Sequence, residues 1–328
     1  MEKLTADKPS LTIYLKQQDW LGTNEKIVST EKPGDGNMNF TLRVITDKRS
    51  FILKQSRGYV EKYPQVSAPA DRALNEAEFY ELVATKPQLD AMMPELIGVD
   101  SDNNVLLLED LGSGSDYTHI YKKGETIPEV DLMTIIDFAA QLHTKLRSET
   151  TSSTLQNLKM RTLNHEHIFK FPYILENGLN LDTVLPGLQE IGLTFKKDEK
   201  LKKAINALGY QYLADGDILL HGDYFPGSWL NTSDGIKIID PEFCFFGFAE
   251  FEIGVTIAHL KMADQPKELI DKTLSHYSAL AKLDDVLTKK FTAVEVLRRI
   301  LGLAQLPLEI DLDKRKELLE EARMTILS

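Results

Sequence analysis

Two aspartates, each at the end of a short apolar run, constrain this chain more than any other feature. Asp223 follows His221-Gly222 after one run, and Asp240 follows the run Ile236–Ile239, seventeen positions later. Short apolar runs bounded by turn residues predict strands, so the two carboxylates can face one cleft from two strand ends. One can take a proton from a hydroxyl while the other holds a metal on a nucleotide. The pattern predicts a metal-assisted phosphotransferase.

Composition is that of an ordinary globular enzyme. The 328 residues are 42% hydrophobic and 27% charged, enough for one large or two medium domains with a substantial core. The net charge of −12 disfavours nucleic acid and anionic membranes as partners, because both bind basic surfaces. Cys244 is the single cysteine, so an internal disulfide is excluded. No apolar run approaches the roughly 20 residues of a membrane span, and residues 1–9 lack the core of a signal peptide. We therefore expect a cytoplasmic protein.

A glycine-rich turn near the start of the chain is a candidate phosphate-binding element. It contains Gly34, Gly36 and Asn37 and precedes a segment, residues 40–44, that alternates with strand period. Glycines let backbone N–H groups approach phosphate oxygens without side chains intervening. A plain turn is the alternative, since Gly/Asn clusters are normal loop chemistry.

A lysine on the returning strand strengthens that interpretation. Lys54 ends the apolar segment Phe51–Lys54, where a charged side chain needs a partner or a ligand. The alternative is an edge-strand lysine that reaches solvent. A helix is predicted over Asp71–Thr85, and Glu76 on it is the first candidate for a carboxylate that holds Lys54, with Glu78 second.

The pattern of elements changes near residue 111. Strands with one main helix are predicted before it and mostly helices after it, so we expect an α+β fold with two parts, residues 1–111 and 112–328. Ser10 and Asp131 are predicted helix N-caps. Further helices are predicted over residues 201–214, 251–262, 266–281, 283–303 and 312–327.

The segment 161–182 is predicted to be irregular and is a candidate substrate lid. It carries His165 and His167, which could form a metal pair, but no cysteine or third histidine lies nearby to support one. His143 lies on the apolar stripe of the preceding helix, and we expect it to be a packed, hydrogen-bonded core residue rather than a ligand.

Several separated motifs, in order, resemble the aminoglycoside-phosphotransferase-like branch of the protein-kinase-like fold, and within it the methylthioribose kinases. The resemblance spans about residues 30 to 305. It is carried by Gly34-Asp35-Gly36-Asn37, Leu53-Lys54-Gln55, Asp71-Arg72 with Glu76-Ala77-Glu78, His221-Gly222-Asp223 with Gly227-Ser228, Ile239-Asp240-Pro241-Glu242-Phe243, Phe251-Glu252-Ile253-Gly254 and Arg298-Arg299-Ile300.

The resemblance implies a two-lobed kinase with ATP and Mg²⁺ as cofactors and a small-molecule hydroxyl acceptor. Asp223 would be the catalytic base. Asp240 and Glu242 would hold Mg²⁺, with Ser228 standing where the wider branch has a metal-binding asparagine. The resemblance also implies a homodimer.

The same resemblance distributes the remaining binding roles between ATP and the acceptor. Lys54, held by Glu76, would contact the α- and β-phosphates, beside the glycine turn. Glu109 to Leu111 would be a hinge whose backbone meets adenine. Arg298 and Arg299 match the arginine pair that contacts methylthioribose in that family.

Departures from the family lie on the acceptor side. Tyr224-Phe225-Pro226 stands where methylthioribose kinases usually have Leu-His-Thr, and their Asn/His/Trp-containing substrate loop has no clear counterpart. We therefore expect a kinase of methylthioribose or a related sugar. The alternatives are a kinase of another small alcohol or aminoglycoside-like acceptor, and a catalytically inactive nucleotide-binding protein. Retention of Lys54, Asp223 and Asp240 together counts against the last.

Overall fold

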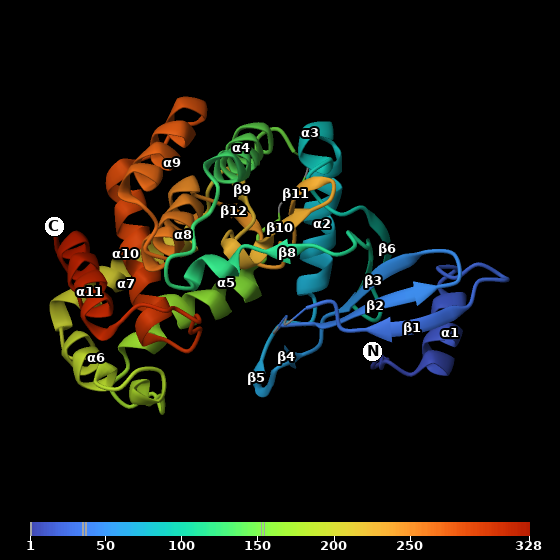
Figure 1. Ribbon diagram of the computed structural model, residues 1–328, viewed down its shortest axis with the longest axis horizontal. Helices are drawn as coiled ribbons and strands as arrows, with labels where there is room; N and C mark the ends of the chain where they lie inside the picture. Colours follow the sequence, from blue (N-terminus) through green and yellow to red (C-terminus); the bar gives the residue numbers. More distant parts are fainter. Residues whose placement is uncertain (1, 35, 37, 152, 154) are drawn as a thin grey trace.

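A five-stranded antiparallel sheet forms most of the N-terminal part of the molecule (Figure 1). The computed structural model describes residues 2–34, 36, 38–151, 153 and 155–328. The sheet order is β1-β2-β3-β7-β6, which puts two apolar strands, β3 and β7, beside each other. The strands are β1 Ile27–Glu31, β2 Phe40–Thr46, β3 Ser50–Gln55, β6 Leu96–Asp100 and β7 Val105–Glu109.

Side chains on the two faces of this sheet belong to two separate hydrophobic cores. Phe51 and Leu53 of β3 pack with helix α1 (Lys8–Gln17) on one face. Ile52 and the α2 helix (Arg72–Ala84) belong to the core on the other face, which continues into the C-terminal part. Because successive strand residues point to opposite faces, Lys54 lies on the α2 face. Lys54 and Glu76 therefore lie on the same side of the sheet, between β3 and α2.

Two predicted helix starts were wrong. α1 begins at Lys8, and its N-cap is Asp7, whose carboxylate accepts the backbone N–H of Ser10 at 3.0 Å. Ser10 lies inside the first turn, because the proline at position 9 suits the start of a helix. α4 begins at Glu129, so Asp131 also lies in the first turn, where its carboxylate accepts the hydroxyl of Tyr117 at 2.8 Å.

Short strands between the two halves carry the loops that hold the sequence motifs. A three-stranded sheet has the order β11-β10-β8, and β9 pairs with β12. These strands are β8 Ser115–Asp116, β9 Ile218–Leu220, β10 Trp229–Thr232, β11 Gly235–Ile238 and β12 Phe245–Gly247; the hairpin β4 Tyr59–Val60 with β5 Tyr63–Ser67 lies apart. The segment that follows β9 and the one that follows β11 contain the two aspartate motifs.

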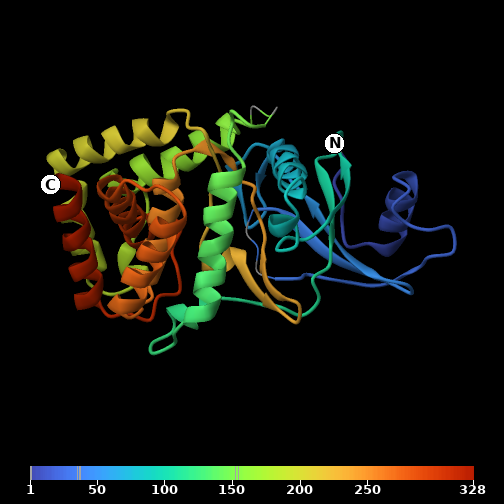
Figure 2. The same ribbon diagram turned by 90° about the horizontal axis from the view of Figure 1, so that it is seen from above.

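The C-terminal part is mostly helical (Figure 2). α8 is buried around nearly its whole circumference, with α10 against it and α11 against α10. The helices are α4 Glu129–Lys145, α5 Leu158–His165, α6 Leu188–Lys196, α7 Glu199–Leu213, α8 Ala249–Met262, α9 Lys267–Leu280, α10 Asp285–Leu301 and α11 Leu312–Leu327, and a short α3 spans Pro87–Asp90. Within the described ranges, no helix is both long and apolar enough to cross a membrane.

The predicted α+β class, with its N-terminal antiparallel sheet and helical C-terminal part, is confirmed. The division at residues 111 and 112 stays a prediction; it falls between the end of β7 and the start of β8.

The prediction of an irregular segment over 161–182 was wrong for its first half. There α5 continues into a π-helical turn, Glu166–Lys170, and a 3₁₀ turn, Phe171–Tyr173. His165 stacks on Phe169 one turn later, which stabilises this helix. The proline at position 172, which is unfavourable inside a helix, hid the helical periodicity of the segment in the sequence.

Candidate active site

Lys54 joins the sheet to helix α2 and to the loop that follows β11. Its Nζ lies 2.7 Å from Oε2 of Glu76 and 2.6 Å from Oδ1 of Asp240. Burial alone would lower the pKa of Lys54, but the charges of Asp240 and Glu76 raise it well above the usual value, so the ammonium stays charged. The structure thus brings together three residues that the sequence had placed in separate motifs.

Asp240 combines a left-handed backbone conformation with a half-exposed side chain. Its φ of +63° lies in the left-handed region, which is uncommon for residues other than glycine and is often found at functional sites. Its side chain is 51% exposed although Lys54 is buried. A half-exposed carboxylate with one oxygen turned to a lysine has coordination capacity left for a hard cation, so Asp240 fits the chemistry of a Mg²⁺ ligand.

The other two predicted metal ligands are already engaged in protein contacts. Oε2 of Glu242 accepts hydrogen bonds from Nδ2 of Asn39 and Nε of Arg72, both at 3.0 Å. The hydroxyl of Ser228 donates to the backbone carbonyl of Asp223 at 2.8 Å, and Ser228 is buried. Metal binding by Glu242 and Ser228 stays a prediction. Nothing near Glu242 in the sequence indicates its pairing with the buried Arg72, 170 residues earlier.

The loops of the two aspartate motifs are bound directly to each other. His221 Nε2 lies 2.8 Å from the backbone carbonyl of Ile239. Gly222 has a φ of +86°, and a Cβ there would lie 2.1 Å from the carbonyl oxygen of Phe243. Only glycine permits so close an approach. The loops that carry Asp223 and Asp240 are therefore in contact, whereas a shared cleft for the two carboxylates stays a prediction.

Glu252, in the first turn of α8, fixes the backbone that leads to Asp223. Its carboxylate accepts the N–H groups of His221 at 3.1 Å and Gly222 at 2.7 Å, together with Nε2 of His143 at 2.9 Å. Burial would raise the pKa of Glu252, but these bonds lower it below the usual value, so the carboxylate is ionised. His143 is, as predicted, a buried core residue, and its other ring nitrogen contacts the hydroxyl of Tyr277.

Asp223 is next to the arginine pair of α10. Nη2 of Arg299 lies 3.4 Å from Oδ1 of Asp223. Burial raises the pKa of Asp223, while the charges of Arg299 and Arg298 oppose that rise. Both arginines are held by the buried Glu295, at 2.5 Å from Nε of Arg299 and 3.0 Å from Nη1 of Arg298. The predicted base and the predicted acceptor-binding residues are thus parts of one charge network.

His259 completes this network from α8. Its Nε2 lies 3.3 Å from Oε1 of Glu295, and its Nδ1 lies 2.5 Å from the hydroxyl of Tyr121. Burial lowers the pKa of His259 to about 4, so the imidazole is neutral at pH 7. Sequence reasoning missed Glu295, His259 and Tyr121. The available signal was an acidic residue three positions before an arginine pair, within the otherwise apolar residues 293–301.

The predicted adenine-binding and phosphate-binding segments lie at the sheet. The backbone N–H of Glu109 donates to the carbonyl of Glu95 at 2.9 Å, at the end of β7. Leu111 follows, half-buried. Gly34 and Gly36 are exposed, with open space where a side chain would begin, and Asn37 lies outside the described residues. Nucleotide binding by these segments stays a prediction.

The sequence matches a known protein family over most of its length. A model of the phosphotransferase enzyme family matches residues 29–285, most of the chain. The chain belongs to the phosphotransferase enzyme family. The methylthioribose kinase of Yersinia pestis (strain Pestoides F) is 28% identical over 263 residues, which cover 75% of this chain and 62% of that enzyme. The matched region therefore spans less than two thirds of the length of such curated relatives.

Solved structures of other phosphotransferases share the fold of this family member. A choline kinase from Streptococcus pneumoniae superposes with a TM-score of 0.56 at 14% identity, covering 98% of this chain and 99% of that one. An ADP-bound aminoglycoside phosphotransferase gives 0.54 at 15% identity, covering 98% and 100%. At such identities the likeness shows the two-lobed, protein-kinase-like fold, and this expectation is confirmed.

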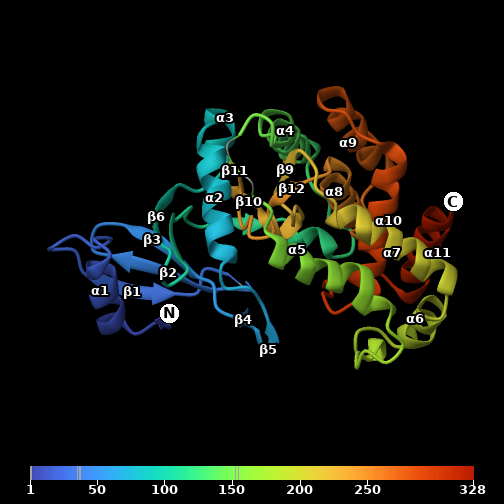
Figure 3. The same cartoon turned by 180° about the vertical axis from the view of Figure 1, so that it is seen from behind.

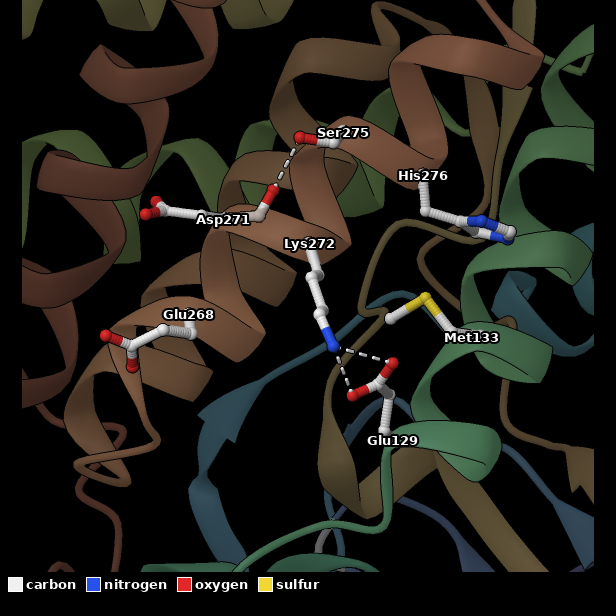
Figure 4. A pocket seen from close by; sticks show the side chains of 7 residues that line it. All are labelled: Glu129, Met133, Glu268, Asp271, Lys272, Ser275 and His276. Atoms are coloured by element: carbon white, nitrogen blue, oxygen red, sulfur yellow. Dashed lines mark hydrogen bonds and ion pairs between the residues drawn. The ribbon is translucent and has the colours of Figure 1, made fainter.

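A surface hollow between α4 and α9 has no part in this site. Figure 4 shows Lys272 of α9 reaching across to Glu129 of α4, with an N–O distance of 2.9 Å. Met133 and His276 also line the hollow. None of the predicted site residues lies there.

His165 and His167 are held by aromatic contacts. His165 stacks on Phe169, and His167 lies against Phe171. Across the part of the chain that the structure describes, no three His, Cys, Asp or Glu side chains gather closely enough to hold a metal.

Proposed function

We propose that this phosphotransferase transfers the γ-phosphoryl group of ATP to a hydroxyl of a small metabolite, with methylthioribose or a related sugar as the acceptor. The observation that carries the proposal is the contact between His221 and Ile239 at 2.8 Å. This contact supports the proposal because Asp223, the proposed base, and Asp240, the proposed metal ligand, follow on the two loops that it joins. Phosphoryl transfer requires mainly such positioning and charge neutralisation.

In this proposal the N-terminal part, residues 1–111, binds ATP. Lys54 would contact the phosphates, because its ammonium is charged and held in place by Glu76. Gly34 and Gly36 would leave backbone N–H groups free to approach phosphate oxygens, and Glu109 to Leu111 would meet the adenine. Mg²⁺, when bound at Asp240, would neutralise charge on the phosphate oxygens.

The acceptor side falls to residues 112–328. Asp223 would accept the proton of the attacking hydroxyl, and burial suits it to this role because it raises the pKa of the carboxyl toward neutral pH. Arg299 keeps the side chain oriented and opposes its protonation. Glu252 accepts two backbone N–H groups just before Asp223, which limits the movement of the proposed base.

The methylthioribose assignment is supported by the curated relatives and by the arginine pair beside Asp223. Kinases of choline and of aminoglycosides share the fold at 14 to 15% identity, so another alcohol is the second candidate. An ADP-release assay with Mg-ATP against methylthioribose, ribose, choline and an aminoglycoside tests both. We expect ADP release with methylthioribose. Absence of ADP release with every acceptor, together with absence of Mg-ATP binding, would contradict the kinase proposal.

A further inference from the structure

Arg72 is a buried arginine to which the chemistry proposed above gives no role. It is the first residue of α2 and is fully buried. Figure 3 shows α2 between the N-terminal sheet and the helical part of the molecule. Glu76, which holds Lys54, follows Arg72 by four positions on the same helix. Residues at this spacing share one helix face, so Arg72 and Glu76 lie on the face that borders the candidate active site.

The terminal nitrogens of Arg72 are bonded to the backbone of three separate segments. Nη2 donates to the carbonyl of Met38 at 2.8 Å, between the glycine-rich turn and β2. Nη1 donates to the carbonyl of Arg57 at 2.8 Å and to that of Pro69 at 2.7 Å. A planar guanidinium presents its donors in a fixed fork. Arg72 therefore fixes the end of the glycine-rich turn relative to the segments that follow β3 and precede α2.

The Nε atom of Arg72 joins this arrangement to the segment 239–243. It donates to Oε2 of Glu242 and to Oδ1 of Asn39, both at 3.0 Å. Nδ2 of Asn39 donates to the same Oε2 of Glu242 at 3.0 Å. All three side chains are buried. Asn39, Arg72 and Glu242 thus form a triangle of mutual hydrogen bonds, which we call the Asn39–Arg72–Glu242 triangle.

This triangle connects the two elements that the proposed function assigns to the phosphates of ATP. The glycine-rich turn lies just before Asn39, and Asp240 lies two positions before Glu242. Protein carboxylates and substrate phosphates commonly bind Mg²⁺ together. Metal and nucleotide therefore strengthen each other's binding only when the turn and Asp240 are correctly separated. The triangle fixes that separation.

We propose that Arg72 is a positioning residue that couples Mg²⁺ binding to ATP binding, because it fixes the glycine-rich turn against the segment 239–243. The inference rests on the proposed kinase function, since it concerns the nucleotide side of the same site. Arg72 is fully buried, so it acts through Asn39 and Glu242 rather than on the ligands themselves. Its loss changes the benefit that each ligand gains from the other.

Calorimetric titration of a non-hydrolysable ATP analogue, with Mg²⁺ and with EDTA, measures this coupling as the ratio of two Kd values. Arg72→Lys keeps the positive charge beside Glu242 but loses the fork. Asn39→Ala removes another member of the triangle and leaves Arg72 in place. In each variant we expect the Mg²⁺-dependent gain in affinity to fall about 10-fold, while Kd in EDTA changes at most about 3-fold. The double variant should fall no further, because both substitutions break one network.

Arg315→Lys is the matched control. Arg315 is buried in α11 and donates to the carbonyl of Leu308 at 3.0 Å, so its replacement removes a buried guanidinium outside the candidate site. Urea denaturation should show a loss of stability in both arginine variants, but Arg315→Lys should keep the wild-type ratio of Kd values. Should Arg72→Lys fail to fold, Asn39→Ala alone decides the test.

Two results overturn the inference and leave the kinase proposal standing. One is a wild-type ratio of Kd values in the folded triangle variants, and the other is an equal loss of coupling in Arg315→Lys. A wild-type protein that binds no nucleotide under either condition contradicts the kinase proposal, and the inference falls with it.

Discussion

Lys54 Nζ lies 2.6 Å from Oδ1 of Asp240, so the third strand of the N-terminal sheet is joined by an ion pair to the loop that follows β11. Glu76 contacts the same ammonium from α2. One buried cation therefore organises elements separated by 186 residues along the chain. Loss of that cation should affect both stability and nucleotide binding.

Lys54→Met tests this double role. The substitution keeps the apolar part of the side chain but leaves the carboxylate of Glu76 buried without its cation. We expect the free energy of unfolding to fall by about 3 kcal/mol, measured by urea denaturation, and ATP affinity to fall at least 10-fold. Lys159→Met is the control, because it breaks an exposed ion pair with Asp71 and should cost at most about 1 kcal/mol.

Much of this arrangement could be predicted from the sequence because the relevant signals are local. Strand period placed Lys54 at the end of an apolar strand, and helix period selected Glu76 over Glu78. Asp223 and Asp240 follow two predicted strands, and their position at the strand ends predicted that both face one cleft. These signals depend on residues within a few positions of one another, and the structure brings Lys54 together with Glu76 and Asp240.

The remaining contacts depend on partners that are distant in the sequence. Glu242 was predicted to bind metal, but the chain pattern does not show that Arg72, 170 residues earlier, occupies one of its oxygens. Glu295 was overlooked because its spacing from Arg298 and Arg299, three and four positions, is also that of ordinary ion pairs on an exposed helix face. The N-caps at Ser10 and Asp131 failed because a neighbouring Asp7 or Pro128 began each helix first.

Glu252→Gln tests how the base-bearing loop is held. Glutamine keeps the shape but replaces an ionised acceptor of two backbone N–H groups with a neutral one. Because hydrogen bonds to a charged group are the stronger ones, we expect a loss of about 2 kcal/mol in stability and at least a 10-fold fall in kcat. Glu250→Gln, on the same helical turn, should leave kcat within a factor of two.

The ionisation of Glu252 also predicts an acid limb in stability. Its folded-state pKa lies below the ordinary 4.5, so the unfolded chain binds the proton more readily. The stabilisation is therefore complete above about pH 4.5 and is lost as the pH falls below that value. Urea unfolding between pH 3 and 6 should show a flatter dependence for Glu252→Gln than for the wild type. An equally steep curve in the variant would contradict the assignment.

Arg299→Met should move the pH dependence of catalysis. Asp223 must be deprotonated to act as a base, so kcat/KM falls as the pH drops through its pKa. Burial places that pKa above the ordinary 3.8, and Arg299 opposes the rise. Removing the arginine should shift the acid limb of kcat/KM upward by about one pH unit. An unshifted or downward-shifted limb would show that Arg299 does not act on the base.

Asp223→Asn is the measurement that tests the account most directly. Asparagine preserves the side-chain shape, and the neighbouring contacts of His221 and Glu252 stay in place. We predict that kcat falls by about 10³-fold, while calorimetry with Mg-ATP shows an unchanged Kd. Near-normal turnover by this variant would contradict the central claim that Asp223 accepts the proton of the acceptor hydroxyl.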